Sequence, residues 1–273
     1  KARAELDRTR PYFDALRSEI KRIFRTVEGV ESRYFYPGDD HPLSGTYAYL
    51  VITADKGLAG MYNQNVLREA QRLLNEHADA KLFVVGEYGR QYFAHHQIPV
   101  ERSFLYTAQN PTMQRAREIS STLLELYDSG AVQKIFVIYT DMKNAMTEEA
   151  KSTRLLPFHR QTFASKPEEK AVKTPFSFEP SIETVLDTLI PSYVSGFIYS
   201  ALVDSFCSEQ NARMTAMRAA NDNAEALLAS LSSDYQRLRQ AEITQEITEI
   251  TAGAAAQRRN AREAQTLCTQ AIS

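Results

Sequence analysis

One long stretch without helix-breaking residues constrains this chain more than any other feature. From Phe197 to Ala252 the sequence contains neither Gly nor Pro, and Gly196 and Gly253 stand at its two ends. The stretch is rich in residues that favour the α-helix, so it predicts one continuous helix. At 1.5 Å per residue its roughly 56 residues would span about 84 Å, more than the width of a globular domain of this size. We therefore expect the helix to extend beyond its domain.

Apolar residues along this helix recur every three or four positions, as they do in the seam of a coiled coil. The seam has one polar member and slips in phase after Leu238, as a stutter would cause. Its members are Met214, Met217, Asn221, Ala224, Leu228, Leu231, Tyr235 and Leu238, followed by Ile243, Ile247 and Ile250. The remaining faces are mostly charged. The pattern predicts either a rod that contacts partners or an ordinary long helix of an all-α bundle.

A second helix is predicted at the amino end, from Lys1 to Val27. Apolar residues return there at helical spacing, and Pro11 inside the pattern is expected to kink the helix or restart it.

The middle of the chain has the pattern of an α/β domain. Short apolar runs alternate with amphipathic segments, which predicts a mainly parallel sheet covered on both faces. The predicted strands are 47–53, 80–86, 100–106, 134–140 and 152–157, and the predicted helices are 63–77, 88–95 and 111–128. We thus divide the chain into an N-terminal helix (1–30), an α/β domain (45–180) and a long C-terminal helix (182–273).

Composition excludes some classes of function. The formal net charge of −2 gives no electrostatic reason to expect nucleic-acid binding. The two cysteines, Cys207 and Cys268, lie far apart and are expected to be free thiols. We find no signal peptide and no apolar run near 18 residues, and therefore expect no membrane span.

No catalytic or metal-binding pattern stands out. The loop from Thr53 to Gly60 has glycines and a lysine after a strand, yet it matches neither phosphate-binding motif, because the lysine precedes the glycines. Gly86 to Gly89 is too short a pattern to indicate more than a turn. The five histidines are scattered, and the adjacent pair His95 and His96 would point to different helix faces. We expect no cofactor and no metal.

Two segments of the long helix resemble a known family. The run 213–223, RMTAMRAANDN, and the run 235–250, YQRLRQAEITQEITEI, are similar to the C-terminal helix of the gamma subunit of F-type ATP synthase, of the bacterial type. The order of helix, α/β domain and helix is also that of the gamma family. The resemblance therefore covers nearly the whole chain and implies an antiparallel coiled coil of the two terminal helices beside a Rossmann-like domain.

The resemblance also implies a function. Gamma subunits are the non-catalytic rotor shaft of a proton-translocating ATP synthase, on the cytoplasmic face of the bacterial plasma membrane. Their partners are the alpha and beta subunits of the catalytic hexamer, the epsilon subunit and the membrane c-ring. A different class remains open: a small-molecule-binding α/β enzyme with a helical dimerisation arm. A generic coiled-coil scaffold is a third reading.

Ten positions match family segments that contact partners. The loop residues Asp55, Lys56 and Gly57 would face the catalytic beta subunits, and Phe178 and Glu179 would lie near the membrane ring and epsilon. The long helix would contact moving loops of the catalytic subunits through Arg213, Arg239, Gln240, Thr244 and Glu246. Each of these residues taken alone could equally be an exposed surface residue, and Phe178 could belong to the core of its own domain.

The sequence departs from its family at two places. Ala59 stands where the family usually has Cys, and about 17 residues continue past Ala256, where gamma subunits generally end. Apolar residues in this tail keep helical spacing, so the tail would lengthen the helix by about 25 Å if helical.

Overall fold

The computed structural model describes residues 2–26, 32–36, 45–77, 79–144, 147–158 and 181–270. The chain forms two compact units, Lys1–Ala216 and Met217–Ser273, which are taken one at a time below. The domain limits that the sequence predicts, at residues 30, 45, 180 and 182, stay a prediction.

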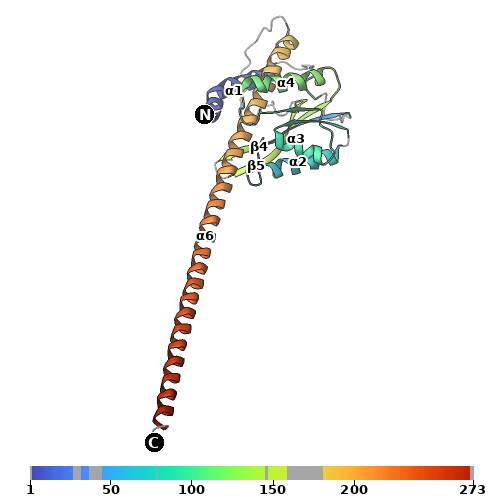
Figure 1. Ribbon diagram of the computed structural model, residues 1–273. Coiled ribbons are helices and arrows are strands. Elements are labelled where there is room, and N and C mark those ends of the chain that lie inside the picture. Colours follow the sequence, from blue (N-terminus) through green and yellow to red (C-terminus); the bar gives the residue numbers. More distant parts are fainter. Residues whose placement is uncertain are drawn as a thin grey trace. The chain divides into compact units, whose positions relative to one another are not determined.

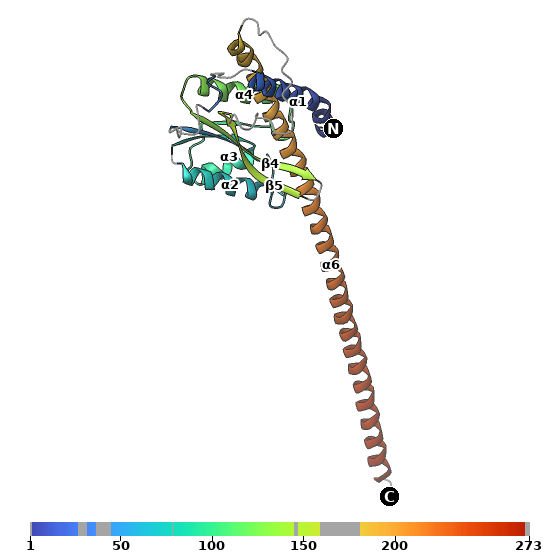
Figure 2. The same cartoon turned by 180° about the vertical axis from the view of Figure 1, so that it is seen from behind.

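The first unit is built on a five-stranded sheet (Figures 1 and 2). Its strands lie in the order β3-β2-β1-β4-β5, and only the pair β4 and β5 is antiparallel. The strands are β1 (Tyr47–Ile52), β2 (Ala80–Val85), β3 (Arg102–Phe104), β4 (Lys134–Asn144) and β5 (Thr147–Leu156). A mainly parallel sheet is thus confirmed, although β4 and β5 are longer than their apolar runs because they pair as a hairpin.

Both faces of the sheet are covered, which explains why β1 is buried along its whole length. Side chains alternate between faces along a strand. Tyr49 and Val51 pack with Val66 and Leu67 of α2 (Tyr62–Glu76) and with Phe93 of α3 (Glu87–His95). The alternate residues of β1 (48, 50 and 52) pack in a second core with α4 (Met113–Asp128) and the first part of α6 (Ile182–Gln270). Figure 1 shows α2 and α3 on the opposite face of the sheet from α4.

One helix starts later than the sequence predicts, and the long helix runs through two residues that usually interrupt a helix. The helix α4 begins at Met113, not at Pro111, because the side chain of Thr112 caps it by accepting a hydrogen bond from the Arg115 amide at 3.3 Å. The helix α6 runs through Pro191 and Gly196, so it begins well before the break-free stretch 197–252. Buried Ile190 and Val194 pack into the core on either side of the proline, and this packing outweighs the lost backbone hydrogen bond.

The N-terminal helix packs against α6 within the first unit. Helix α1 (Ala2–Thr26) is one continuous element with Pro11 inside it, so the proline does not restart it. Its residues Ile20 and Ile23 belong to the second core. Phe13 approaches Gly196 so closely that a Cβ atom on that glycine would lie 2.1 Å from the ring. Gly196 therefore serves as the contact point for α1 and does not end the helix.

The second unit consists of the rest of α6, from Met217 to Gln270. Gly253 lies inside this helix, and the tail past Ala256 is helical to Gln270. The seam residues are solvent-exposed within the chain, among them Leu228 at 66%, Tyr235 at 65% and Ile250 at 71%. An exposed apolar stripe of this length indicates a surface that another helix or a partner covers.

Helix α6 also holds the one candidate membrane span found in the described part of the chain. An 18-residue window has a mean hydropathy of 1.2, and half of it is buried within the protein. The sequence reading missed this window because its apolar residues are interrupted. One such window is weak evidence for a span, because a helix of a protein core passes the same test of length and composition.

Candidate partner-contact site at the carboxyl end of the sheet

The loop from Asp55 to Gly60 follows β1 directly and is anchored at its base. The amide of Ala54 donates a hydrogen bond of 2.9 Å to the side-chain oxygen of Asn63 on α2. The Glu87 amide, at the start of α3, donates one of 3.0 Å to Oδ1 of Asp55. Ala59 is buried against Ala54 and Tyr62, so the position that usually holds Cys in the family is a small core position here.

The anchoring fills one anion-binding position near the loop. A helix N-terminus binds anions through its free amides, and the Asp55 carboxylate already occupies that place on α3. Gly86 has a φ of +96°, and a Cβ atom there would lie 2.3 Å from the carbonyl oxygen of Thr53, just after β1. Its role is close strand packing. That the loop binds no nucleotide stays a prediction from its motif.

The crest of the loop is exposed. Lys56, Gly57 and Leu58 all face solvent, and Leu58 has 75% of its surface exposed. Leu58 also has a φ of +62°, the left-handed region that a residue with a branched side chain adopts at a cost of roughly 1–2 kcal/mol. An exposed, apolar residue held in a strained conformation points to a contact surface for a partner.

The structure brings Arg213 of α6 to this loop. One terminal nitrogen of its guanidinium donates to the carbonyl oxygens of Gly57 at 3.1 Å and Lys56 at 3.4 Å. The other terminal nitrogen lies 2.6 Å from Oε1 of Glu209, one turn earlier on α6. Ala212 packs against the buried base of the loop. Two sets of residues that the sequence singled out separately therefore form one site.

Glu209 is the member of this site that sequence reasoning missed. The residue is only 3% exposed. Burial raises the pKa of Glu209 and the charge of Asp55 adds to that rise, while Arg213 acts in the opposite direction. Oε2 of Glu209 and Oδ2 of Asp55 have no hydrogen-bond partner among the described residues. The spacing from Glu209 to Arg213, four residues on a helix, was a visible signal, but the burial was not.

The other predicted contact residues are not part of this site. Arg239, Gln240, Thr244 and Glu246 lie in the second unit, all exposed, within about two turns of α6. Thr244 donates its hydroxyl to the Gln240 carbonyl oxygen at 2.7 Å, a bond within the helix. Phe178 and Glu179 lie outside the described residues.

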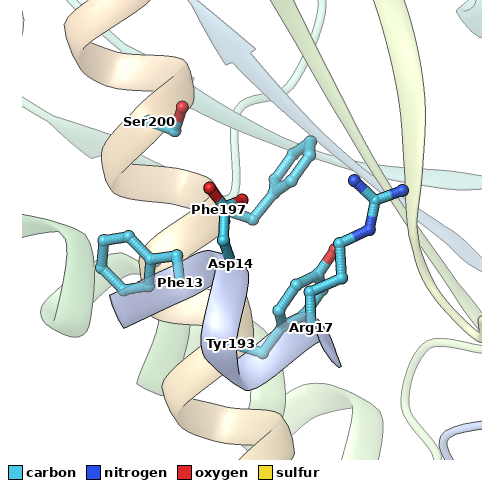
Figure 3. A pocket seen from close by; sticks show the side chains of 7 residues that line it. Phe13, Asp14, Arg17, Tyr193, Phe197 and Ser200 are labelled. Carbon is cyan, nitrogen blue, oxygen red and sulfur yellow. The ribbon is translucent and has the colours of Figure 1, made fainter. Parts of the chain in front are cut away.

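A separate open cavity of about 170 Å³ lies between α1 and α6 (Figure 3). Figure 3 shows Phe13, Asp14 and Arg17 from α1 opposite Tyr193, Phe197 and Ser200 from α6. The serine of this lining, Ser200, has no histidine or lysine beside it there to act as a base. Within the described ranges no three His, Cys, Asp or Glu side chains are grouped to hold a metal ion.

Known proteins resemble this chain along most of its length. The sequence model of a family described as ATP synthase matches residues 1–257. The ATP synthase gamma chain of Ruminiclostridium cellulolyticum is 40% identical over 259 residues, which cover 94% of this chain and 88% of that one. The ATP synthase gamma chain of Caldanaerobacter subterraneus is 42% identical over 264 residues, with coverage of 93% and 88%.

A solved structure shares the fold. The central stalk and c-ring structure of the mitochondrial ATP synthase of Tetrahymena thermophila contains a chain that matches with a TM-score of 0.56 and 24% identity. The match covers 81% of this chain and 96% of that one. The last part of the tail, residues 258–273, lies beyond the family match.

Proposed function

The chain belongs to the ATP synthase gamma-chain family, and from this we propose that it is the central rotor shaft of a bacterial F-type ATP synthase. It would couple ion-driven rotation to ATP synthesis or hydrolysis in the catalytic hexamer. The observation that supports the proposal beyond family membership is the hydrogen bonding of Arg213 to the backbone of the loop crest. It unites the two segments that family resemblance assigns to catalytic-subunit contacts.

The chemistry of the site suits a contact that forms and breaks. Lys56 and Leu58 supply one charge and one apolar side chain, both exposed. An exposed ion pair contributes only about 0–1 kcal/mol, so a rotor could release it at each step without a deep energy trap. Four further exposed polar residues, Arg239, Gln240, Thr244 and Glu246, would give similar weak contacts along the helix.

Rotation would act through differential contact energy. A shaft with dissimilar faces presents different surfaces to three chemically identical catalytic subunits. Each subunit is then biased toward a different conformation, and hence toward a different nucleotide affinity. The shaft itself needs no catalytic group for this task, and we propose that it is a non-catalytic subunit.

The remaining partners follow from the family. We propose that the α/β domain joins the shaft to the epsilon subunit and the membrane c-ring through the segment with Phe178 and Glu179. As part of a membrane-associated complex, the chain would lie peripherally on the cytoplasmic face of the membrane.

Reconstitution tests the proposal. The full chain would be mixed with alpha and beta subunits, and native mass spectrometry would ask whether one copy joins three plus three larger chains. The complex is expected to hydrolyse ATP, whereas the chain alone is expected to show no turnover. ATPase activity of the isolated chain, or its exclusion from the complex, would contradict the proposal.

A charge reversal tests the site. In the whole enzyme, Lys56→Glu is expected to reduce the number of ions moved per ATP hydrolysed, while thermal unfolding stays nearly unchanged, because an exposed substitution usually shifts stability by less than about 0.5 kcal/mol. Arg68→Glu, an exposed residue on α2, is the matched control and should couple normally. Equal coupling in both variants would remove the loop crest from the contact surface.

A further inference from the structure

We infer that Glu209 is a positioning residue for the loop crest: it holds the Arg213 guanidinium against the carbonyl oxygens of Lys56 and Gly57, and so fixes the surface from which Lys56 and Leu58 are presented. This inference rests on the proposed function of the crest as a contact surface. It adds a residue that is only 3% exposed and so offers a partner almost no surface.

The geometry leaves Arg213 little freedom. Its guanidinium contacts three oxygens at once, two on the loop backbone and one on the Glu209 carboxylate. The side chain of Glu209 is 4% exposed and that of Arg213 is 24% exposed, so the pair is largely shielded from water. A guanidinium can hold such a planar arrangement because its donors are fixed in direction.

The arrangement also decides which cation a partner meets. Arg213 is paired with Glu209 and turned toward the loop backbone, whereas Lys56 is exposed at the crest. The Glu209–Arg213 pair therefore acts mainly inside the chain, and the more exposed charge of the site belongs to Lys56. That Arg213 itself contacts a partner stays a prediction from the sequence.

Packing alone does not explain a glutamate at position 209. A buried carboxylate loses its hydration, and Oε2 gains no hydrogen bond from a described residue in return. The charge of Asp55 opposes it further. A residue that served packing alone would be apolar at this position, so the ionic side chain is accounted for by its effect on Arg213 and the loop.

Cleavage of the Lys56–Gly57 peptide bond measures how firmly Glu209 and Arg213 hold the loop, an arrangement called the clamp from here on. Trypsin cleaves after lysine only when the surrounding backbone opens, so the rate of cleavage reports local opening. The experiment digests the full chain under native conditions and follows the fragment 1–56 by mass spectrometry, relative to total loss of intact chain. Glu209→Gln is expected to speed cleavage at Lys56 by roughly fivefold or more, because a neutral amide holds the guanidinium less firmly.

Two further variants define the comparison. Arg213→Gln should accelerate cleavage to a similar degree, and the double variant should open no faster than either single one, since the residues act as a unit. Glu225→Gln makes the same chemical change at an exposed position of α6 and should leave the rate unchanged. Arg213 is partly exposed, so its variant keeps the test valid even if Glu209→Gln folds poorly.

The outcomes separate this inference from the proposed function, because the digestion uses the chain without partners. Unchanged cleavage at Lys56 in Glu209→Gln, or an equal acceleration at every site, overturns the clamp and leaves the rotor assignment standing. Faster cleavage supports the clamp even if assembly with alpha and beta subunits fails. In the whole enzyme, Glu209→Gln should lower the number of ions moved per ATP hydrolysed. Faster cleavage with normal coupling overturns the positioning role.

Discussion

The contact of Phe13 with Gly196 makes a prediction about how α1 is held on α6. Replacing Gly196 with Ala has two opposing effects on the free energy of unfolding. Alanine is favoured over glycine inside a helix by about 1 kcal/mol. The new methyl group would lie 2.1 Å from the ring of Phe13, far inside contact distance, and overpacking of this kind costs roughly 1–3 kcal/mol. We expect a net destabilisation of about 0–2 kcal/mol.

A double-mutant cycle isolates the steric part. In a Phe13→Ala background the clash is absent, so Gly196→Ala should stabilise the protein by about 1 kcal/mol. The coupling free energy between the two sites should then equal the overpacking cost of roughly 1–3 kcal/mol. Urea unfolding followed by near-ultraviolet circular dichroism of tyrosine measures it, because the chain has 14 Tyr and no Trp.

A glycine elsewhere on the same helix serves as the control. Gly253 has nothing within 4 Å of its virtual Cβ atom, so Gly253→Ala should only strengthen the helix, by about 1 kcal/mol locally. Amide hydrogen exchange around residue 253 would report this. If Gly196→Ala stabilises the protein equally with and without Phe13, then α1 does not pack on α6 at this glycine and the reasoning fails.

Three other perturbations have definite expected results. Leu58→Gly should raise the free energy of unfolding by about 0–1 kcal/mol, because the relief of left-handed strain slightly exceeds the entropy cost of glycine. The same change should lower the number of ions moved per ATP hydrolysed in the whole enzyme. Urea denaturation and ion-pumping assays measure the two effects, and unchanged coupling would show that Leu58 touches no partner. The pKa of Glu209, which faces Asp55 and Arg213, is raised by burial above the value of 4.5 that it has when free. The folded state therefore holds this proton more tightly, so the stability from this group is complete below about pH 4.5 and is lost as the pH rises through the raised pKa. Urea unfolding from pH 4 to 7 should show this loss of stability in the native chain, and the share that comes from Glu209 should be absent in Glu209→Gln. Parallel stability profiles of the two proteins would disprove that Glu209 has a raised pKa. Truncation after Ala256 should leave ATP hydrolysis by the complex within a few-fold of normal, because the predicted contact residues precede it. Loss of assembly would show that the tail contacts the catalytic subunits.

Local sequence sufficed for the elements of this protein. Helix and strand patterns depend on neighbours a few residues away, so the apolar runs identified the five strands, and the break-free run identified the long helix. The family resemblance was equally local, since it rested on two ungapped segments of one helix.

Tertiary packing decided how α6 tolerates two residues that usually interrupt a helix, and what its residues do. The helix continues through Pro191 and Gly196, and the buried neighbours Ile190 and Val194 hold it in the core there. At Gly196 the missing side chain makes room for Phe13. A glycine that ends a helix and one that admits a neighbouring ring look alike in a sequence.

The same limit applies to the contact site. Lys56 and Arg213 are 157 residues apart in the chain, and no periodic pattern connects positions so distant. Their contact exists because α6 crosses the loop that follows β1, and the burial of Glu209 follows from that crossing. The sequence alone determined which residue types were available at each place. Only the fold determined that one arginine is held by a buried glutamate while a lysine is left exposed, because burial and charge pairing depend on distance in space.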